Sequence, residues 1–435
     1  MEVLSSSDYL SINQNFDMAS YIAGDSIKAK GGEKVYAFTL LTATVLVPFL
    51  QLGISFYLSI QVVVILFMVK LLGLKFYVNT ILNNTGLLSL FLLAALLSVQ
   101  GINDILFVLR QILMFCIVVS ALMFKPAANS SVFVGYYLKD LLILVVVCEA
   151  VICAIQAYYF SKGVYFAIPY QWYVINGGIL ETSDLALEYG TRFRPVGTYG
   201  EPSYLALVAN LIFLVLYPSL RSGGRKYVLL TAVICVNILC GSLSGLVFFV
   251  AIFMISANSI SISKVLMSGA AVTVLLVAAV WGVDEFRARV FDVLLAGEDR
   301  SAFVRLEVPF RMVGYVLFSG LGGVYPENII HGFQDLSADI AYSIDEISDN
   351  AALNFVINNG WFGVFIIIGF VVKFYRKLTD LRVAMIIFYS SMQNGNIFSL
   401  DKAALIAFLL LVYRYFENGE SLKLRNAKKV GSDGR

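Results

Sequence analysis

The feature that most constrains this chain is a series of apolar runs, each approaching 20 residues, that recur from residue 36 to residue 416. An α-helix needs about 20 predominantly apolar residues to cross the hydrocarbon of a bilayer. The runs are continuous and do not alternate with polar residues, which favours helices over a membrane β-barrel. Because 59% of the 435 residues are hydrophobic and only 14% are charged, the sequence predicts an all-α polytopic membrane protein.

These runs predict about twelve membrane-spanning helices. Their approximate limits are 36–54, 58–74, 85–100, 104–124, 139–160, 200–218, 227–240, 243–258, 265–283, 351–373, 380–397 and 402–416. Together they form a single membrane domain, 36–416, with tails at 1–35 and 417–435. The first tail lacks the apolar core of a cleavable signal peptide, so we expect it to be cytoplasmic. Gly241 and Ser242 predict a tight turn between two short spans.

The basic residues between the spans indicate the orientation. Starting from a cytoplasmic N-terminus, alternation places most lysines and the basic C-terminal tail inside, as the positive-inside rule expects. Two long loops, 161–199 and 284–350, then face outward, and they contain seven arginines but only one lysine. These arginines either tie the loops to helix ends or bind a diphosphate or acidic sugar, since guanidinium groups match phosphate oxygens in bidentate fashion.

The sequence lacks the features that are typical of several classes of function. All five cysteines fall inside apolar runs, so we expect no disulfide framework and no metal site. We find no nucleotide-binding P-loop and no dinucleotide fingerprint, and we predict no cofactor. A net charge of +2 does not predict a nucleic-acid partner. The absence of an inverted repeat argues against a secondary transporter.

The segment 194–203, with the sequence RPVGTYGEPS, is the most informative part of the chain. It lies where the first long loop returns to the membrane. Two arginines and two glycines lead into the next helix: Arg192, Arg194, Gly197 and Gly200. Pro202 suits a first helical turn, and the N-terminus of that helix favours an anion. Glu201 is then either a helix-start carboxylate without a chemical role or a general base.

The second long loop carries two further patterns. Arg305 precedes a segment that closes at a Gly-x-Gly turn, and Arg311 is separated from Gly322 by ten residues. At the end of the loop, Asp349 and an asparagine precede the next span, which contains Gly-x-x-Gly about ten residues later. His331 is the only histidine in the chain.

Arg110 is a charge inside the predicted span 104–124. A charge within a membrane span is costly and marks a functional candidate by default. One interpretation pairs Arg110 with Glu149, midway along the next span, in a buried ion pair. The other directs Arg110 into a lipid-facing cavity, where it contacts a diphosphate headgroup.

In topology and in these motifs, the chain resembles bacterial O-antigen polymerases, the Wzy class, within a superfamily of GT-C-like glycosyltransferases that also includes O-antigen ligases. The resemblance implies a multi-pass protein of the bacterial inner membrane, with both termini in the cytoplasm and the active site facing the periplasm. It implies transfer of an undecaprenyl-diphosphate-linked glycan to the terminal sugar of another lipid-linked repeat unit. A flippase and a chain-length regulator are the protein partners that it suggests.

The resemblance also implies roles for the candidate residues. Arginines can stabilise the departing diphosphate in place of a metal, and one carboxylate or histidine can remove the acceptor proton. The diphosphate candidates are Arg194, Arg305, Arg110, Arg311 and Arg192. The base candidates, in order, are Glu201, Asp349 and His331. Gly197, Gly200 and Gly322 shape the loops.

Two alternatives remain. An O-antigen ligase shares the fold but transfers glycan to the lipid A core, and ligases of this kind usually have a histidine where this chain has Asp349. A lipid-linked glycan transporter without chemistry is the second alternative. Two long arginine-bearing loops on one side argue against the transporter.

Overall fold

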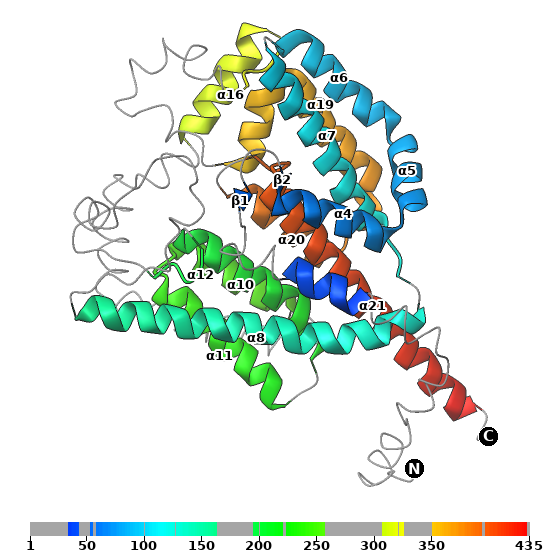
Figure 1. Ribbon diagram of the computed structural model, residues 1–435, viewed down its shortest axis with the longest axis vertical. Helices are drawn as coiled ribbons and strands as arrows, with labels where there is room; N and C mark the ends of the chain where they lie inside the picture. The colour runs from blue at the N-terminus through cyan, green and yellow to red at the C-terminus, as the bar shows by residue number, and fades with distance from the viewer. Residues whose placement is uncertain are drawn as a thin grey trace.

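α-Helices make up almost all of the described chain (Figure 1). The computed structural model describes residues 34–42, 53–54, 58–99, 101–126, 128–162, 195–199, 201–220, 223–256, 307–320, 322–325, 350–393 and 396–432. A short helix covers residues 34–42, and a minimal antiparallel hairpin pairs β1 (Gly53–Ile54) with β2 (Leu58–Ser59).

The remaining elements follow in chain order. The first half contains α4 (Ile60–Leu72), α5 (Leu74–Leu82), α6 (Thr85–Ser98), α7 (Ile102–Met123) and α8 (Ala128–Ser161). The second half contains α10 (Pro202–Leu216), the 3-10 turn η3 (Tyr217–Ser219), α11 (Gly224–Leu239), α12 (Leu243–Ser256), α16 (Val308–Ser319), α19 (Ala351–Leu378), α20 (Leu381–Ser391) and α21 (Leu400–Ser432).

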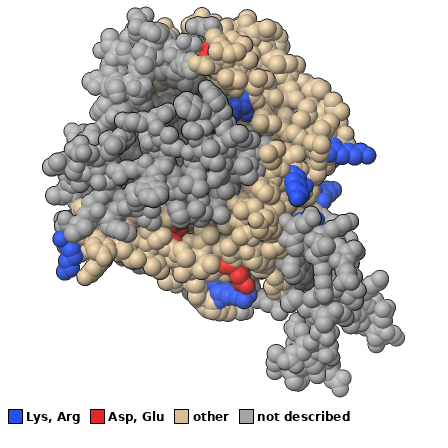
Figure 2. All heavy atoms as spheres, in the orientation of Figure 1, with Lys and Arg blue, Asp and Glu red and all other residues tan. Residues whose placement is uncertain are grey.

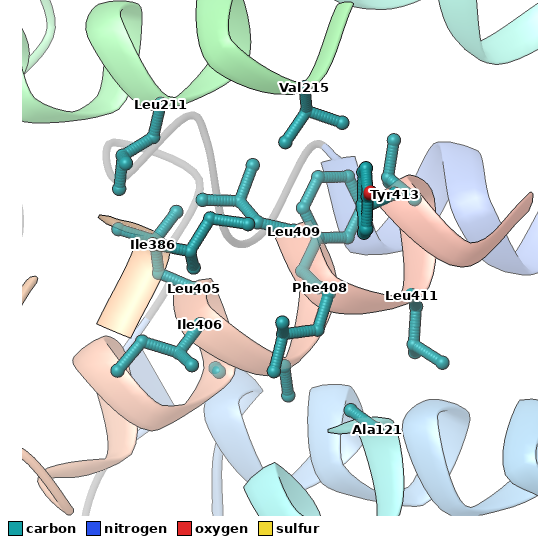
Figure 3. Packing of buried hydrophobic residues seen from close by; sticks show 14 of the residues in the cluster. Ala121, Leu211, Val215, Ile386, Leu405, Ile406, Phe408, Leu409, Leu411 and Tyr413 are labelled. Carbon is teal, nitrogen blue, oxygen red and sulfur yellow. The ribbon is translucent and has the colours of Figure 1, made fainter. Parts of the chain in front are cut away.

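Helix α21 is the centre of the structure. It packs against α4, α7, α8, α10 and α20. Every residue from 402 to 416 is buried, as expected for a helix whose surface is predominantly apolar. Figure 3 shows Leu405, Phe408 and Leu409 of this helix beside Leu211 and Val215 of α10. The last membrane span predicted from the sequence is therefore the core of the fold.

Two groups of helices lie on opposite sides of α20 and α21 (Figure 1). In the first group α19 packs against α6 and α16, and α6 packs against α7. In the second group α8 packs against α11, and α10 packs against α11 and α12. The turn between α11 and α12 passes through Gly241 (φ 57°), which confirms the predicted tight turn.

The described helices fit a membrane protein but do not confirm twelve spans. Four of them are long and apolar enough to cross a bilayer: α7, α8 from Val134, α10 with η3, and α19. Helices α5 and α6 form a pair bent by 70°, which is a broken span or a re-entrant loop. Figure 2 shows few charged side chains among the described residues of this face.

Helix length explains why some of the twelve predicted spans are not among these four helices. The predicted spans 227–240, 243–258 and 380–397 form helices of 16, 14 and 11 residues. At about 1.5 Å per residue, these helices are shorter than a hydrocarbon layer of about 30 Å. The predicted span 265–283 and most of 36–54 lie outside the described residues. The predicted tail after residue 416 is helical to Ser432 because strong helix formers dominate it.

A buried pair of asparagines joins three helices of the second group. The Asn237 amide on α11 donates to the Asn210 side-chain oxygen on α10 at 2.8 Å. The Asn210 amide donates to the Gly245 carbonyl of α12, also at 2.8 Å. Both asparagines are fully buried, so each amide must find its partner inside the protein.

We therefore predict that Asn237→Leu lowers the thermal unfolding midpoint of the purified protein in detergent. The substitution leaves the Asn210 oxygen without its donor, at a cost of about 1–2 kcal/mol. Asn79→Leu, at an exposed position of α5, is the matched control and should leave the midpoint unchanged. Equal midpoints for both variants would contradict a structural role for the pair.

Candidate functional site

Helix α8 holds the segment 195–199 through two side chains on one of its faces. Glu149 and Gln156 are seven residues apart, which is about two turns of an α-helix. The Gln156 side-chain oxygen accepts from the backbone N–H groups of Val196 (3.0 Å) and Gly197 (2.8 Å), and its amide donates to the Gly197 carbonyl (2.9 Å). The Glu149 carboxylate accepts from Thr198, from the backbone N–H at 3.0 Å and from the hydroxyl at 2.5 Å. We call these five hydrogen bonds the α8 clamp.

The clamp depends on glycine at position 197. Gly197 has a φ of 61°, a conformation that side chains with a Cβ rarely adopt. A Cβ at this position would collide with the Glu149 carboxylate and with Leu205 of α10. Position 197 therefore requires glycine because the loop backbone there passes close to α8.

Helix α10 begins immediately after the clamp. Glu201 is its N-cap residue and Pro202 occupies the first helical position, as the sequence predicts. The Glu201 carboxylate makes no capping bond to the helix backbone; it accepts a hydrogen bond from the Ser203 hydroxyl. Tyr204 packs against Tyr199, with ring centroids 5.7 Å apart. The segment is thus fixed from both α8 and α10.

A buried lysine lies beside the start of α10. Lys402, in the first turn of α21, is only 2% exposed. Its ammonium lies 5.5 Å from the centre of the Tyr204 ring, in cation–π geometry. The N-terminal ends of α10 and α21 therefore meet at this lysine.

The second motif packs into a bend of α19. Gly360 has a φ of 56° and interrupts the helix, so the Ile357 carbonyl accepts instead from the Val324 N–H at 2.8 Å. The Gly323 N–H donates to the Ser98 hydroxyl of α6 at 2.7 Å. A side chain at Gly323 would overlap the backbone of Asn358. The segment 322–325 is thus locked between α6 and α19, and its approach requires glycine.

Tyr325 ends this locked segment in an apolar setting. It is buried, and its ring packs edge-on against Phe107 of α7. Burial raises the pKa of the Tyr325 phenol above its usual range, and the Asp104 carboxylate on α7 adds to the increase. Tyr325 is therefore a neutral phenol at physiological pH.

The third motif starts α19 and meets the turn between α20 and α21. The Asn350 side chain caps the helix by accepting from the Leu353 N–H at 3.1 Å, which confirms the predicted asparagine at a helix start. The Ala351 N–H donates to the Gln393 carbonyl at 2.7 Å, and its carbonyl accepts from Ile397. The turn that follows α20 therefore joins the start of α19 to the start of α21.

Comparison with known proteins identifies the family. The sequence matches the WcaD colanic acid polymerase family over residues 37–415. The chain belongs to this polymerase family. No curated protein and no solved structure matches it. Membership in the WcaD family, which is a Wzy-like family, confirms the resemblance drawn from the sequence motifs, and it implies a glycosyltransferase-type polysaccharide polymerase that uses lipid-linked oligosaccharides.

The WcaD-family match spans all of the motifs, but the structure describes only some of the predicted site residues. Glu201, Gly197 and Gly322 lie in the elements described above. Six predicted residues lie outside the described part of the chain: Arg192, Arg194, Gly200, Arg305, His331 and Asp349. Arg194, Gly200 and Asp349 each directly adjoin a described segment.

The two remaining arginines are exposed. Arg311 on α16 forms a salt bridge with Glu307 at 2.6 Å. Arg110 is exposed on α7, and among the described residues it forms no salt bridge with Glu149. The interpretation that pairs Arg110 with Glu149 is therefore wrong. The Glu149 carboxylate instead accepts two hydrogen bonds from Thr198, and Arg110 is exposed.

Sequence reasoning missed Gln156 and Lys402. Gln156 lies in an apolar run as an isolated polar residue, and such residues inside membrane spans often have a specific partner. Lys402 stands at the start of the last apolar run, where a lysine is usually assumed to reach the interface. Both signals are present in the sequence, but neither identifies the partner.

We predict that Gln156→Leu lowers polymerisation by about tenfold or more, because the unclamped backbone of 196–197 no longer holds its flanking residues in place. The measurement is the length distribution of surface polysaccharide at matched protein level. Gln156→Glu keeps the acceptor oxygen but loses the amide donor, so it should retain part of the activity. Ile155→Ala, at an exposed neighbouring position, is the control. Normal polymer from Gln156→Leu would contradict the role of the clamp.

Proposed function

We propose that this polymerase transfers a glycan from undecaprenyl diphosphate to the terminal sugar of a second lipid-linked repeat unit, on the periplasmic face of the bacterial inner membrane. The observation that carries the proposal is the family match over residues 37–415, together with the α8 clamp. The clamp holds residues 196–198, which lie in the sequence between Arg194, a cation, and Glu201, a carboxylate. In a glycosyl transfer from a diphosphate donor, a cation can stabilise the departing diphosphate and a carboxylate can remove the acceptor proton.

The reaction exchanges one bond at the anomeric carbon. The acceptor hydroxyl oxygen forms the new glycosidic bond while the bond from the anomeric carbon to the diphosphate oxygen breaks. The acceptor proton goes to a general base, and the electron pair of the broken bond leaves with the diphosphate. Cationic side chains positioned at that oxygen stabilise the developing negative charge.

The proposed roles follow from the positions of the residues in the chain. Arg194 directly precedes the clamped segment and Arg305 precedes α16; both are proposed to contact the diphosphate, with Arg110, Arg192 and Arg311 as further candidates. Glu201, whose carboxylate does not cap α10, is the first candidate for the base. Asp349, which directly precedes the helix cap of α19, is the second, and His331 is the third.

The proposal also covers metal independence, membrane topology and protein partners. The arginines act without a metal ion, and both termini lie in the cytoplasm. A flippase delivers the lipid-linked repeat unit, and a chain-length regulator controls the product. These partners follow from the resemblance to Wzy proteins.

We predict that cells lacking this protein lose the polymer ladder of their surface glycan and that the wild-type gene restores it. Arg305→Ala should fail to restore the ladder, because the departing diphosphate loses a charge-assisted contact worth about 2 kcal/mol or more. Arg305→Lys should restore it only in part, since lysine cannot bind in bidentate fashion. Arg225→Ala is the matched control, because Arg225 is an exposed arginine at the start of α11 that pairs with Asp140 of α8.

Each outcome of this gel is informative. A ladder that collapses to a single repeat unit in the deletion strain supports a polymerase. Loss of attachment with continued accumulation of lipid-linked polymer would instead indicate a ligase. An unchanged ladder in the deletion strain would reject both enzymes and support the transporter.

A further inference from the structure

A group of charged side chains gathers where α7 and α19 end, beside Arg414 of α21. Lys377, in the last turn of α19, interacts electrostatically with Arg414 and with Lys125, which follows the end of α7. Two carboxylates and a further arginine complete the group. We call the following residues the Arg414 cluster: Lys125, Lys377, Asp380, Arg382, Arg414 and Glu417.

The cluster carries more positive charge than its own carboxylates neutralise. It contains four cations and two carboxylates. Both oxygens of Asp380 are already engaged, one by the Tyr413 hydroxyl at 2.7 Å and the other by the Arg382 N–H at 3.1 Å. Like charges that are held close together repel one another. A further anion among these cations would therefore be electrostatically favourable.

Arg414 has a bidentate edge that no described residue uses. Its side chain is 9% exposed, and its Nη1 atom donates to the Glu417 carboxylate at 2.6 Å. The Nε and Nη2 atoms are buried and have no hydrogen-bond partner in the described part of the chain. Their N–H bonds run parallel, and this edge of a guanidinium group binds two oxygens of one phosphate or carboxylate. Because buried donors are rarely left unpaired, the edge points to a ligand with two acceptor oxygens.

Helix ends and the salt bridge do not account for this arginine. The helix dipole favours cations at a helix C-terminus, which explains Lys125 and Lys377 without any ligand. Arg414 lies in the middle of α21, which continues to Ser432, so its position is not explained in that way. Glu417 engages only one of its nitrogens. The free edge of Arg414 is therefore the feature that needs a further partner.

The cluster lies at the level expected for lipid headgroups. Helices α7 and α19 are two of the four described helices that are long and apolar enough to cross a bilayer, and Lys125 and Lys377 lie at their C-terminal ends. Ile368, Val372 and Tyr375 are exposed along the preceding turns of α19. A lipid whose headgroup reaches the cluster can thus rest its acyl chains against an apolar surface.

We propose that the Arg414 cluster binds the phosphate of an anionic phospholipid, with the free edge of Arg414 holding two phosphate oxygens and with Lys125 and Lys377 adding positive charge. Basic sites between membrane helices are suited to anionic headgroups. The inference goes beyond the proposed glycosyl transfer and does not depend on it.

Access to the Arg414 edge requires a side chain to move, because the two nitrogen atoms are covered. Lys125 is exposed, Lys377 is partly exposed, and the Glu417 side chain is 49% exposed. Long side chains of this kind adopt many rotamers where solvent surrounds them. They can therefore rearrange around an incoming headgroup while the backbone of α21 stays in place.

The test is native mass spectrometry of the purified full-length protein in a neutral detergent, with dioleoyl phosphatidylglycerol or dioleoyl phosphatidylcholine added. The two lipids share their acyl chains and a phosphate, but only phosphatidylglycerol has a net negative charge. Wild type should bind phosphatidylglycerol about tenfold more tightly than phosphatidylcholine. Arg414→Gln should bind phosphatidylglycerol about tenfold more weakly than wild type, because the bidentate contact is lost. Arg414→Lys, which keeps the charge but not the planar edge, should lose only part of the affinity.

The matched control is Arg225→Gln. Arg225 is an exposed arginine that also pairs with a carboxylate, that of Asp140, so its substitution measures the effect of removing one positive charge from the surface. This variant should bind phosphatidylglycerol like wild type, and equal binding by Arg414→Gln and Arg225→Gln would overturn the inference. If Arg414→Gln does not purify as folded protein, the double variant Lys125→Gln and Lys377→Gln takes its place. It should lose about tenfold in affinity, and wild-type affinity in this variant would equally overturn the inference.

Inorganic phosphate distinguishes a lipid headgroup from a free anion. It should not displace bound phosphatidylglycerol, because it lacks the acyl chains that lie against α19. Displacement by inorganic phosphate, or equal binding of phosphatidylglycerol and phosphatidylcholine by wild type, would overturn the assignment to an anionic phospholipid.

Discussion

Irregular backbone in the apolar interior of a membrane protein must find its hydrogen-bond partners within the protein, because hydrocarbon offers none. The two motif segments of this chain meet that constraint in different ways. Segment 195–199 is bonded to side chains of a neighbouring helix, Glu149 and Gln156. Segment 322–325 uses backbone groups that the bend at Gly360 frees from α19, together with the hydroxyl of Ser98. In both cases the hydrogen bonds that satisfy the buried backbone groups are the same bonds that position the segment.

The arrangement of helices brings these segments to a common region. Helix α21 contacts both groups of helices, and the turn before it is bonded to the start of α19, while Lys402 contacts Tyr204 at the start of α10. Three helices, α10, α19 and α21, therefore present their N-terminal ends in connected positions. Helix N-termini favour anions, so the fold itself creates a positive region without a large number of basic side chains.

The features that the sequence predicted depend on residues close together in the chain, whereas the features that it missed depend on contacts between residues far apart. Apolar runs predicted α7 (104–124 against Ile102–Met123) and the start of α19 at residue 351, because burial in a membrane leaves a continuous local signal. The motifs predicted the Glu201–Pro202 helix start and the Gly241 turn. One of the two interpretations of Arg110 paired it with Glu149, whereas Glu149 contacts Thr198; a contact between residues 149 and 198 has no local pattern in the sequence. The bend between α5 and α6 and the burial of Lys402 were missed because both are set by tertiary packing. Most of the proposed catalytic residues lie outside the described chain, so their roles remain predictions.

The α8 clamp has a consequence for how such polymerases diversify. The chain leaves α8 at its C-terminal end, near Lys162, and is bonded again to the same helix at Val196. The intervening stretch therefore starts and finishes on one rigid body. Loop-closure entropy changes only slowly with length, so residues can be inserted or deleted between these two points at small thermodynamic cost. Neither the helix nor the clamped segment needs to shift when that happens. The length of the chain between these two points and the position of the clamped backbone can therefore change independently of each other.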